Sequence, residues 1–502
     1  MPTALFSLSD KTGLTDLARG LQALGWDFLA SGGTAAHLRA AGLPVQEVAD
    51  YTGSPEILGG RVKTLHPVVH GGLLARDTAP DRADLERIGA RPIDLLAVNL
   101  YPFHQTVARP GVTLEEAIEQ IDIGGVALIR AAAKNFARVA VLTDPADYPA
   151  VLDELRTAGA LSEATRRRLA VKAFAHTAAY DAAIHAYLSG NAAETLTLYP
   201  VQSLRYGENP HQAAALYGWE PDAGPLGGTL LQGKPLSYNN LLDLDAAWRA
   251  VVSFERPTVV IVKHLSPCGI ASADTLAAAY PPALASDPVS AFGGIIAANR
   301  PFDRATAALL LEKKHFVECI IAPGFTPEAR DLLAKKENLR LLSMPDLEIT
   351  PRHEYRSVVR GLLRQDVDLG DPPETEWRVV TRREPTAAEW QALRFAWKAV
   401  QHVKSNAIVF VQGEATVGIG GGQPNRVDCV RMAAERAGEQ ARGAVMASDA
   451  FFPFPDSVEE AAKAGVTAII QPGGSIRDEL SIQTAEAHGM AMVFTGVRHF
   501  RH

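Results

Sequence analysis

The sequence is poor in cysteine, with only Cys268, Cys319 and Cys429 among its 502 residues. These cysteines lie far apart in the chain and form no C-x-x-C pair, so the sequence indicates neither a disulfide framework nor a zinc knuckle. Because few and dispersed cysteines are typical of a reducing compartment, we expect the chain to work in the cytoplasm.

Long hydrophobic runs are also missing. The first residues, MPTALFSLSDKTG, have no basic segment ahead of a long apolar core, as a secretory signal would require. No uninterrupted apolar run is long enough to span a bilayer. We therefore expect neither secretion nor a membrane partner.

An excess of positive charge is absent as well. Lys and Arg together number 49 against 57 Asp and Glu, and the formal net charge is -8. This balance argues against a general nucleic-acid-binding protein, so no nucleic-acid partner is expected. Any anionic ligand must be met by a local cluster of cations.

The chain is long enough for more than one domain, and it has the pattern of an α/β protein. In the first part, apolar segments alternate with helical patterns, which favours a largely parallel, doubly wound sheet. The expected strands and the long closing helix are residues 3–10, 27–31, 93–101, 137–144 and 162–188. Periodicity is lost in residues 189–202, so the expected domains cover 1–198 and 199–502.

The second part returns to apolar strands that are followed by glycines, at residues 258–264, 290–299, 406–411 and 465–474. Its two halves, roughly 199–350 and 385–502, are faintly alike, since Val262-Lys263-His264 is similar to Val403-Lys404-Ser405. This likeness suggests a duplication. The intervening segment is rich in Pro, Arg and acidic residues, and we expect it to join the halves.

Two turns near the N-terminus have the composition of a phosphate site. In the segment SGGT at 31–34, between an expected strand and helix, glycines let backbone N–H groups converge on an anion at the positive end of the helix. Ser7 and Lys11 occupy the equivalent turn of the preceding unit. Neither turn matches G-x-x-x-x-G-K-[ST] or G-x-G-x-x-G. Ordinary glycine-rich turns with an N-cap serine remain the alternative.

A cationic segment, GGRVKTLHPVVHGG, follows at 59–72 and carries Arg61 and Lys63. It is too interrupted to predict a helix or a strand, and cations on such a segment favour ligand contact. His66 and His70 have H-x-x-x-H spacing, but Pro67 and the missing glutamate argue against a metal there.

Polar residues also stand where strands end and helices begin in the first part: Tyr101 in NLYPF, Asp122 in IDIGG and Lys134 in RAAAKNF. Doubly wound sheets bind their ligands at such places. Taken alone, each residue is more often structural, and only their common placement indicates a site.

A lysine and a histidine are adjacent in IVKHLSPCG, after the apolar run PTVVIV. Neighbours on a strand point to opposite faces, so Lys263 and His264 can serve one site only if the strand ends at Lys263 and turns. Ser266-Pro267 and Gly269 have the composition that such a turn uses.

Two further segments carry many hydrogen-bonding groups. The turn LRYGENPHQ at 204–212 holds Arg205 and Tyr206, and it is either part of a site or a solvated loop. The last strand runs directly into RHFRH, which begins with Arg498 and is either packed or a frayed basic end.

Many of these segments together resemble one family, the bifunctional purine-biosynthesis proteins that join an AICAR formyltransferase to an IMP cyclohydrolase. The similarity runs in one order from the first strand to the last residues, through SDKTG, SGGTA, GGRVKTLHP, NLYPF, QIDIGG, RAAAKN, KAFAHTAAYD, LRYGENPHQ, VKHLSPCG, SDPVSAFGG, IIAPGF, KSNAIV, GIGGGQPNR, SDAFFPF and RHFRH. The resemblance implies a methylglyoxal-synthase-like cyclohydrolase domain, followed by two cytidine-deaminase-like subdomains that use 10-formyltetrahydrofolate. It also implies a homodimer whose transferase site draws on both subunits.

For the transferase, the acceptor is a weakly nucleophilic aromatic amine, so its attack needs a base and a group that holds negative charge. A histidine titrates near ~6.5, whereas a lysine near ~10.4 would need about 4 kcal/mol to match it, so His264 is the expected base. Lys263 would stay protonated and stabilise the oxyanion or protonate the leaving nitrogen. By resemblance, the folate and nucleotide contacts are Asn406, Arg205, Tyr206, Phe451, Arg498 and Glu318, the last standing where some members carry aspartate.

For the cyclohydrolase, ring closure within one bound molecule depends mainly on positioning. The resemblance implies a catalytic set of Lys63, Tyr101, Asp122 and Lys134, in which Asp122 helps to deprotonate the amide and Tyr101 with Lys63 steadies the oxyanion. The expected phosphate and substrate contacts are Ser7, Lys11, Ser31, Gly32, Gly33, Thr34, Arg61 and Thr64.

Two other functions remain open at this stage. The first part could be a sensor of a phosphorylated ligand, as methylglyoxal-synthase-like domains can be, and the second part could be a nucleobase deaminase. A zinc deaminase requires H-x-E and P-C-x-x-C, and neither motif is present, so we expect no zinc and no required metal.

Overall fold

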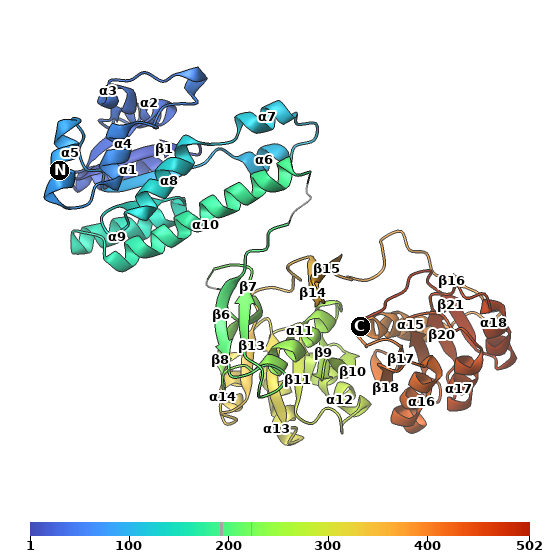
Figure 1. Cartoon of the computed structure of the whole chain (residues 1–502). Helices are drawn as coiled ribbons and strands as arrows, with labels where there is room; N and C mark the ends of the chain where they lie inside the picture. The colour runs from blue at the N-terminus through green and yellow to red at the C-terminus, as the bar shows by residue number, and fades with distance from the viewer. Residues whose placement is uncertain (191–193, 222) are drawn as a thin grey trace. The chain divides into compact units, whose positions relative to one another are not determined.

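A computed structural model describes residues 1–190, 194–221 and 223–502, which form two compact units, Met1–Leu196 and Thr197–His502 (Figure 1). Residues 191–193, within the stretch expected to hold the domain boundary, lie outside the described part. Each unit is described by itself. Among the described residues, no helix combines the length and the apolar character needed to cross a membrane.

The described part of the first unit is a five-stranded parallel sheet in the order β3-β2-β1-β4-β5, with helices on both faces. Its strands are β1 (Thr3–Leu8), β2 (Asp27–Ala30), β3 (Gln46–Glu47), β4 (Leu95–Asn99) and β5 (Ala140–Leu142). One face packs against α1 (Leu14–Ala23), α2 (Gly32–Ala40) and α9 (Tyr148–Ala158), and the other against α4 (Pro67–Leu74), α8 (Gly124–Lys134) and α10 (Glu163–Leu188). The remaining helices are α3 (Val48–Thr52), α5 (Ala79–Arg87), α6 (Phe103–Val107) and α7 (Leu114–Glu119). The expected doubly wound α/β fold is confirmed.

In the segment 59–72, where the sequence predicted neither a helix nor a strand, the helix α4 begins at Pro67. Pro67 takes the first helical position, where no N–H is needed, and His66 caps the helix by accepting from the N–H of Val68 at 3.2 Å. The proline therefore begins this helix instead of preventing it.

The described part of the second unit has one 12-stranded mixed sheet, in the order β16-β21-β20-β19-β17-β18-β10-β9-β11-β12-β13-β8. Its strands are β8 (Thr229–Gln232), β9 (Thr258–Lys263), β10 (Ser266–Ser272), β11 (Gly294–Ala298), β12 (Val317–Ala322), β13 (Arg340–Ser343), β16 (Arg378–Val379), β17 (Ala407–Gln412), β18 (Ala415–Gly421), β19 (Val445–Ser448), β20 (Ala468–Gln471) and β21 (Ala491–Phe494). Two hairpins stand apart from it: β6 (Tyr199–Leu204) with β7 (Ala214–Gly218), and β14 (His353–Val358) with β15 (Gly361–Asp366).

The element order of this unit is repeated, since a helix, a hairpin and three helix–strand pairs occur twice. On one face lie α11 (Tyr238–Val252) and α15 (Ala387–Val400), which share one core. The other face carries α12 (Leu276–Ser286), α13 (Arg304–Glu312) and α14 (Pro327–Leu333) in the first half, and α16 (Arg426–Ala437), α17 (Asp456–Ala464) and α18 (Asp478–Ala487) in the second.

The residues first matched between the two halves are not equivalent. β9 and β17 occupy the same place in the repeat, so Lys263, at the end of β9, corresponds to Gln412. Lys404 precedes β17 and lies at the other end of its strand. The similarity of VKH to VKS was therefore misleading, because these tripeptides lie at opposite ends of equivalent strands.

Candidate functional site

Strand register brings the predicted transferase residues to the same edge of the 12-stranded sheet, by which we mean the side where β9, β18, β19, β20 and β21 end. β9 ends at Lys263, and β18, antiparallel to β10, ends where Gly421 pairs with Ala407 at the start of β17. β19 ends at the same edge because Ser448 pairs with Ile408, and the parallel strands β20 and β21 end there too. Lys263, His264, Asn406, Phe451 and Arg498 lie at or just beyond this edge, distributed over the strands from β9 to β21.

β9 does end at Lys263, and the turn consists of His264 and Leu265, because Ser266 already pairs with Lys263. The expectation that Ser266-Pro267 and Gly269 form the turn is wrong, since all three lie in β10. Gly269 serves packing instead, because a Cβ there would lie 1.9 Å from the carbonyl oxygen of Ala283 on α12. His264 is exposed at the turn.

Two residues that the sequence reading missed hold this turn. The Lys263 ammonium donates to the carbonyl oxygen of Phe292 at 2.6 Å. The carboxylate of Asp243, on α11, accepts from the backbone N–H groups of His264 and Leu265 at 3.3 Å and 2.7 Å. Both partners are distant from the turn in sequence. Phe292 lies in the SAFGG motif, which could have marked it as a candidate, but no motif marks Asp243.

Asn406 is fixed by its neighbours at the start of β17. Its amide nitrogen donates to the carbonyl oxygens of Gln423 and Pro424 at 2.8 Å and 3.0 Å. Its oxygen accepts from Arg426 at 2.7 Å, and Arg426 forms a buried ion pair with Asp449. The orientation of this amide therefore depends on a buried charge pair that the sequence reading did not identify.

The C-terminal segment is not a frayed end, because His499 and Arg501 anchor it, although Arg498, Phe500 and His502 are exposed. The His499 side chain is buried, and its two ring nitrogens lie 2.7 Å from Asp368 and 2.8 Å from Asp371. Burial opposes the charged imidazolium, but hydrogen bonds to the two carboxylates outweigh burial and raise the pKa of His499 to about 9. The adjacent Arg498 is exposed, with its guanidinium 4.3 Å from the ring centre of Phe500.

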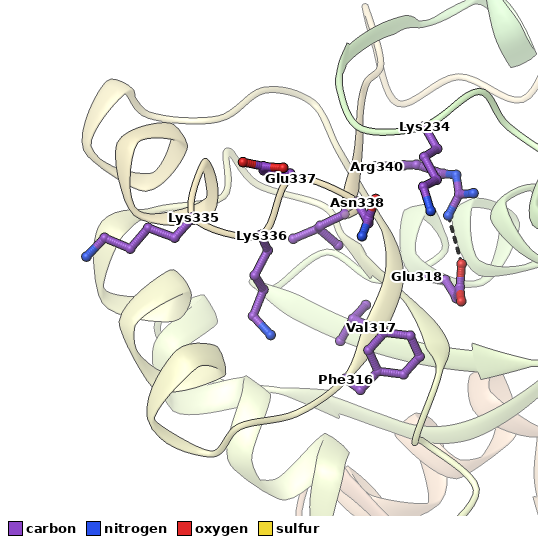
Figure 2. Close-up of a pocket in the computed structure, with 10 residues that line it drawn as sticks. Lys234, Phe316, Val317, Glu318, Lys335, Lys336, Glu337, Asn338 and Arg340 are labelled. Atoms are coloured by element: carbon purple, nitrogen blue, oxygen red, sulfur yellow. Dashed lines mark hydrogen bonds and ion pairs between the residues drawn. The ribbon is translucent and has the colours of Figure 1, made fainter.

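Glu318 lies near the start of β12, at the same edge, beside a cationic pocket (Figure 2). It accepts from Arg340 at 2.7 Å, and the pocket of about 580 Å³ is also lined by Lys234, Lys335 and Lys336. The ring of Phe316, another lining residue, lies 5.2 Å from that of Phe292. The pocket is thus connected to the Lys263 side of the turn through two phenylalanines whose rings pack at a tilt of 44°.

Arg205 and Tyr206 follow β6 and lie outside the 12-stranded sheet. The Arg205 guanidinium lies 5.5 Å from the ring centre of Tyr206. The turn that follows is joined to the first turn of α11, because Asn239 donates to the carbonyl oxygen of Glu208 at 3.5 Å. Among the described residues, no hydrogen bond, ion pair or ring contact joins Arg205 or Tyr206 to His264.

In the first unit, the two expected phosphate turns meet at the carboxyl ends of β1 and β2. The hydroxyls of Ser7 and Ser31 lie 3.2 Å apart, and Ser31 precedes the first residue of α2. Gly32 has a positive φ of 27°, which suits glycine. The hydroxyl of Thr34 is used internally, since it accepts from and donates to the backbone of Leu8 at 3.1 Å, so this geometry does not support a ligand contact by that hydroxyl.

The cations expected at this site are held by neighbouring groups. Lys11 donates to the backbone oxygen of Ser9 at 3.1 Å, Lys63 lies 3.3 Å from Glu56, and Arg61 pairs with Glu119. Such exposed pairs are worth little, so an anion of higher charge can replace the carboxylates.

Asp122 and its neighbours lie at the start of α8. The Asp122 carboxylate accepts from the N–H of Gly125 at 2.7 Å, and Gly124 is so close to Thr64 that a Cβ would lie 2.9 Å from its hydroxyl. Burial raises the pKa of Asp122, although the N–H groups of Gly125 and Tyr101 oppose this effect. A half-buried carboxylate of this kind is a better base than a solvated one.

Lys134 is at the opposite end of α8, about 15 Å along the helix from Gly124 at 1.5 Å per residue. It lines a pocket of about 660 Å³ together with Asp122, His70 and Arg130. Lys63 and Tyr101 do not line this pocket. The structure therefore groups Thr64 with the Asp122 end of the site and leaves Lys134 at its far end.

No group of three or more His, Cys, Asp or Glu side chains in the described ranges has a geometry that could hold a metal ion. The three cysteines are free and buried.

Comparison with known proteins gives two family matches that together span most of the chain. A model described as the MGS-like domain matches residues 13–127, and one described as the AICARFT/IMPCHase bienzyme matches residues 132–436.

Curated relatives match over their full length. "Bifunctional purine biosynthesis protein PurH" of Trichormus variabilis is 54% identical over 506 residues, covering 99% of both chains. The protein of the same name from Myxococcus xanthus is 54% identical over 518 residues, covering 99% of this chain and 100% of the relative. A solved structure, "Crystal structure of ForH", is 40% identical and covers 39% of this chain and 100% of its own, with a TM-score of 0.36 that is too low for a conclusion about the fold.

Proposed function

This chain belongs to the AICARFT/IMPCHase bienzyme family, and from that premise we propose how its two parts divide the work. The chain is a bifunctional enzyme of purine biosynthesis, an AICAR formyltransferase and an IMP cyclohydrolase. We assign cyclohydrolase activity to residues 1–198 and formyl transfer to residues 199–502, whose repeated halves would be the two cytidine-deaminase-like subdomains.

In the transferase, the formyl donor is of the folate type, as the family implies, and we propose 10-formyltetrahydrofolate. The amine of AICAR attacks the formyl carbon while the neutral imidazole of His264 takes the amine proton. The Lys263 ammonium stabilises the resulting oxyanion. When the tetrahedral intermediate collapses, the bond between the formyl carbon and the folate nitrogen breaks. That nitrogen takes a proton from His264 or Lys263, and formyl-AICAR and tetrahydrofolate leave.

The remaining transferase residues would bind and orient the substrates. Asn406 would orient the folate, since its amide is already fixed by Arg426. The nucleotide would be held by Arg205, Tyr206, Glu318, Phe451 and Arg498. The cationic pocket beside Glu318 supports an anionic substrate at this edge of the sheet.

In the cyclohydrolase, the carboxamide nitrogen of formyl-AICAR attacks its own formyl carbon, and loss of water then gives IMP. Asp122 would accept the amide proton, which its raised pKa favours. Tyr101 and Lys63 would hold the oxyanion, with Lys134 completing the set. The 5'-phosphate would be bound by Ser7, Lys11, Ser31, Gly32, Gly33 and Arg61. Thr64 would contact the substrate near Asp122, and the Thr34 hydroxyl, which is engaged with Leu8, would support the turn instead of contacting the phosphate. Because Ser7 and Ser31 meet, the two turns can hold one phosphate.

We further propose that the enzyme acts as a homodimer in the cytoplasm and binds neither nucleic acid nor membrane. The free, buried cysteines agree with a reducing compartment. A second subunit would supply the transferase site with groups such as Arg205 and Tyr206, since within the described part of one chain no hydrogen bond or ring contact joins them to His264.

One observation carries the proposal: Lys263, His264, Asn406, Phe451 and Arg498 arrive at the same sheet edge from distant parts of the chain. The test is to supply AICAR and 10-formyltetrahydrofolate to the purified chain and to follow tetrahydrofolate and IMP. We expect His264→Ala to lose folate turnover, and Lys63→Ala to keep it while formyl-AICAR accumulates. Equal loss of both products in both variants would contradict the division of labour.

A further inference from the structure

The turn that carries His264 has a backbone conformation that its own residues disfavour. His264 and Leu265 connect β9 to β10 with φ values of 52° and 65°, the sign pattern of a type I′ hairpin. Such turns favour Asn-Gly, because most side chains resist positive φ. Within the described ranges, no other two successive non-glycine residues lie in the left-handed region. The turn therefore needs support from outside its own sequence.

That support comes from Asp243. Its carboxylate oxygens accept from the N–H of Leu265 at 2.7 Å and from the N–H of His264 at 3.3 Å. Hydrogen bonds to an ionised acceptor are stronger than those between neutral groups. Among the described residues, no cation forms an ion pair with Asp243. Its charge is thus directed at the turn.

The geometry of the catalytic pair depends on this turn. Lys263 is held from the other side, because its ammonium donates to the carbonyl oxygen of Phe292 at 2.6 Å. His264 is exposed, and no hydrogen bond to its imidazole ring fixes it in the described structure. The imidazole is therefore placed relative to the ammonium by the backbone of the turn alone.

We propose that Asp243 is a positioning residue for formyl transfer: its carboxylate holds the backbone of His264 and Leu265 in the left-handed conformation, so that His264 and Lys263 face one formyl donor. This inference rests on the proposed roles of His264 and Lys263. Asp243 touches neither substrate; it acts through the turn.

The first test compares Asp243→Ala and Asp243→Asn with Asp245→Asn. Asp245 is on the same helix, and its partly exposed carboxylate pairs with Arg249 at 2.8 Å. Because small displacements of reacting groups cost rate, we expect kcat for formyl transfer to fall by about 10- to 100-fold in the Asp243 variants. KM for both substrates should change by less than about threefold, as for a group that acts on the chemical step. Asp245→Asn should match the wild type.

A rescue variant separates support of the turn from a general structural role. Glycine adopts positive φ without steric cost, so Leu265→Gly in the Asp243→Ala background should restore kcat by at least about fivefold. Leu265 is partly buried against the core, so its removal lowers stability, and a purely structural defect would become worse. Cyclohydrolase turnover of supplied formyl-AICAR should stay at the wild-type rate throughout.

A wild-type kcat in Asp243→Ala would overturn the inference, as would a loss of kcat that Leu265→Gly does not relieve. If Asp243→Ala does not fold, Asp243→Asn, with the same shape, carries the comparison. Failure of the proposed function gives a different result, since His264→Ala would then keep formyl transfer. Hydrogen exchange at the Leu265 amide decides the inference even in that case: it should be faster in Asp243→Ala, and unchanged exchange would overturn the inference.

Discussion

The two halves of the 12-stranded sheet contain equivalent hairpins that are built in opposite ways. β17 and β18 are joined by Gly413 and Glu414, and Gly413 supplies the positive φ, at 58°. β9 and β10 are joined by His264 and Leu265, which both have positive φ. The β17–β18 hairpin has glycine where its turn prefers it. The β9–β10 hairpin lacks glycine in its turn, and this is the place where we propose catalysis.

The supporting helices differ in the same way. When α11 and α15 are aligned on Trp248 and Trp397, the position of Asp243 is taken by Ala392, which is buried. A turn that begins with glycine needs no carboxylate to hold it. The comparison teaches that the repeated scaffold is the same in both halves, and that of the two equivalent hairpin turns only the one carrying His264 has non-glycine residues at positive φ and a carboxylate that supports them.

The largest expected effect tests whether the two hairpins differ in function. Lys263→Ala removes an ammonium proposed to stabilise the oxyanion, so formyl transfer should fall by about 10²- to 10³-fold in kcat. Gln412→Ala, at the equivalent position in the second half, should leave the rate within about twofold of the wild type. Steady-state release of tetrahydrofolate measures both. Equal losses would show that the halves do not differ as described.

The second prediction concerns equivalent buried polar residues after β11 and β19. Asn299 accepts from the N–H of Thr258 at 2.9 Å, and Asp449 accepts from that of Ala407 at 3.0 Å, but Asp449 also forms the buried pair with Arg426. Asp449→Ala leaves a buried guanidinium unpaired, so it should lower the free energy of unfolding by about 3–5 kcal/mol.

Asn299→Ala, which leaves only neutral groups unpaired, should cost about 1–3 kcal/mol. Urea denaturation compares the two variants. If Asn299→Ala lowered the free energy of unfolding as much as Asp449→Ala does, the buried charge pair would not have the larger stabilising effect that we assign to it.

The third prediction uses the tail that follows β21, which has no counterpart in the first half. The pKa of His499 is raised from 6.5 to about 9, so its ion pairs stabilise the fold fully below pH 6.5 and lose this effect as pH rises through 9. The free energy of unfolding should therefore fall by ~3 kcal/mol between pH 6.5 and pH 9.5.

Tryptophan fluorescence during denaturation can measure this loss, because Trp377 and Trp397 both donate to Asp371 beside His499. His499→Gln should remove the dependence in that pH range. If the free energy of unfolding of His499→Gln fell by the same amount over this pH range, the pH dependence would come from other groups.

The smallest expected effect is at Gly413. A Cβ there has open space around it, so Gly413→Ala changes only the backbone preference at positive φ. It should lower the free energy of unfolding by about 1 kcal/mol and leave formyl transfer unchanged. A loss of formyl transfer would contradict the assignment of this hairpin to a structural role.

The alternation of apolar segments with helical patterns predicts most of the fold of the first unit. The strands at 3–10, 27–31, 93–101 and 137–144 and the helix at 162–188 all occur, because their apolar patterns match the period of each element. The helix α4 was not predicted because glycines and Pro67 interrupt its segment, although Pro67 begins the helix. Local pattern cannot distinguish these two uses of proline without the cap from His66.

The support of the proposed site could not be predicted in the same way. Asp243 lies 20 residues before Lys263 and looks like an ordinary polar residue of α11, and nothing local links Asp449 to Arg426. These contacts depend on strand register, which fixes pairs that are distant in sequence. The sequence could indicate the groups that we propose for the chemistry, since they stand in short motifs, but not the groups that hold them.

The most direct test of the central claim is formyl transfer by His264→Ala, measured with and without added imidazole. If the imidazole of His264 is the base at this sheet edge, transfer should fall by about 10²- to 10⁴-fold, and free imidazole should restore part of the rate in proportion to its neutral form. A His264→Ala enzyme that transfers the formyl group at the wild-type rate would contradict the account.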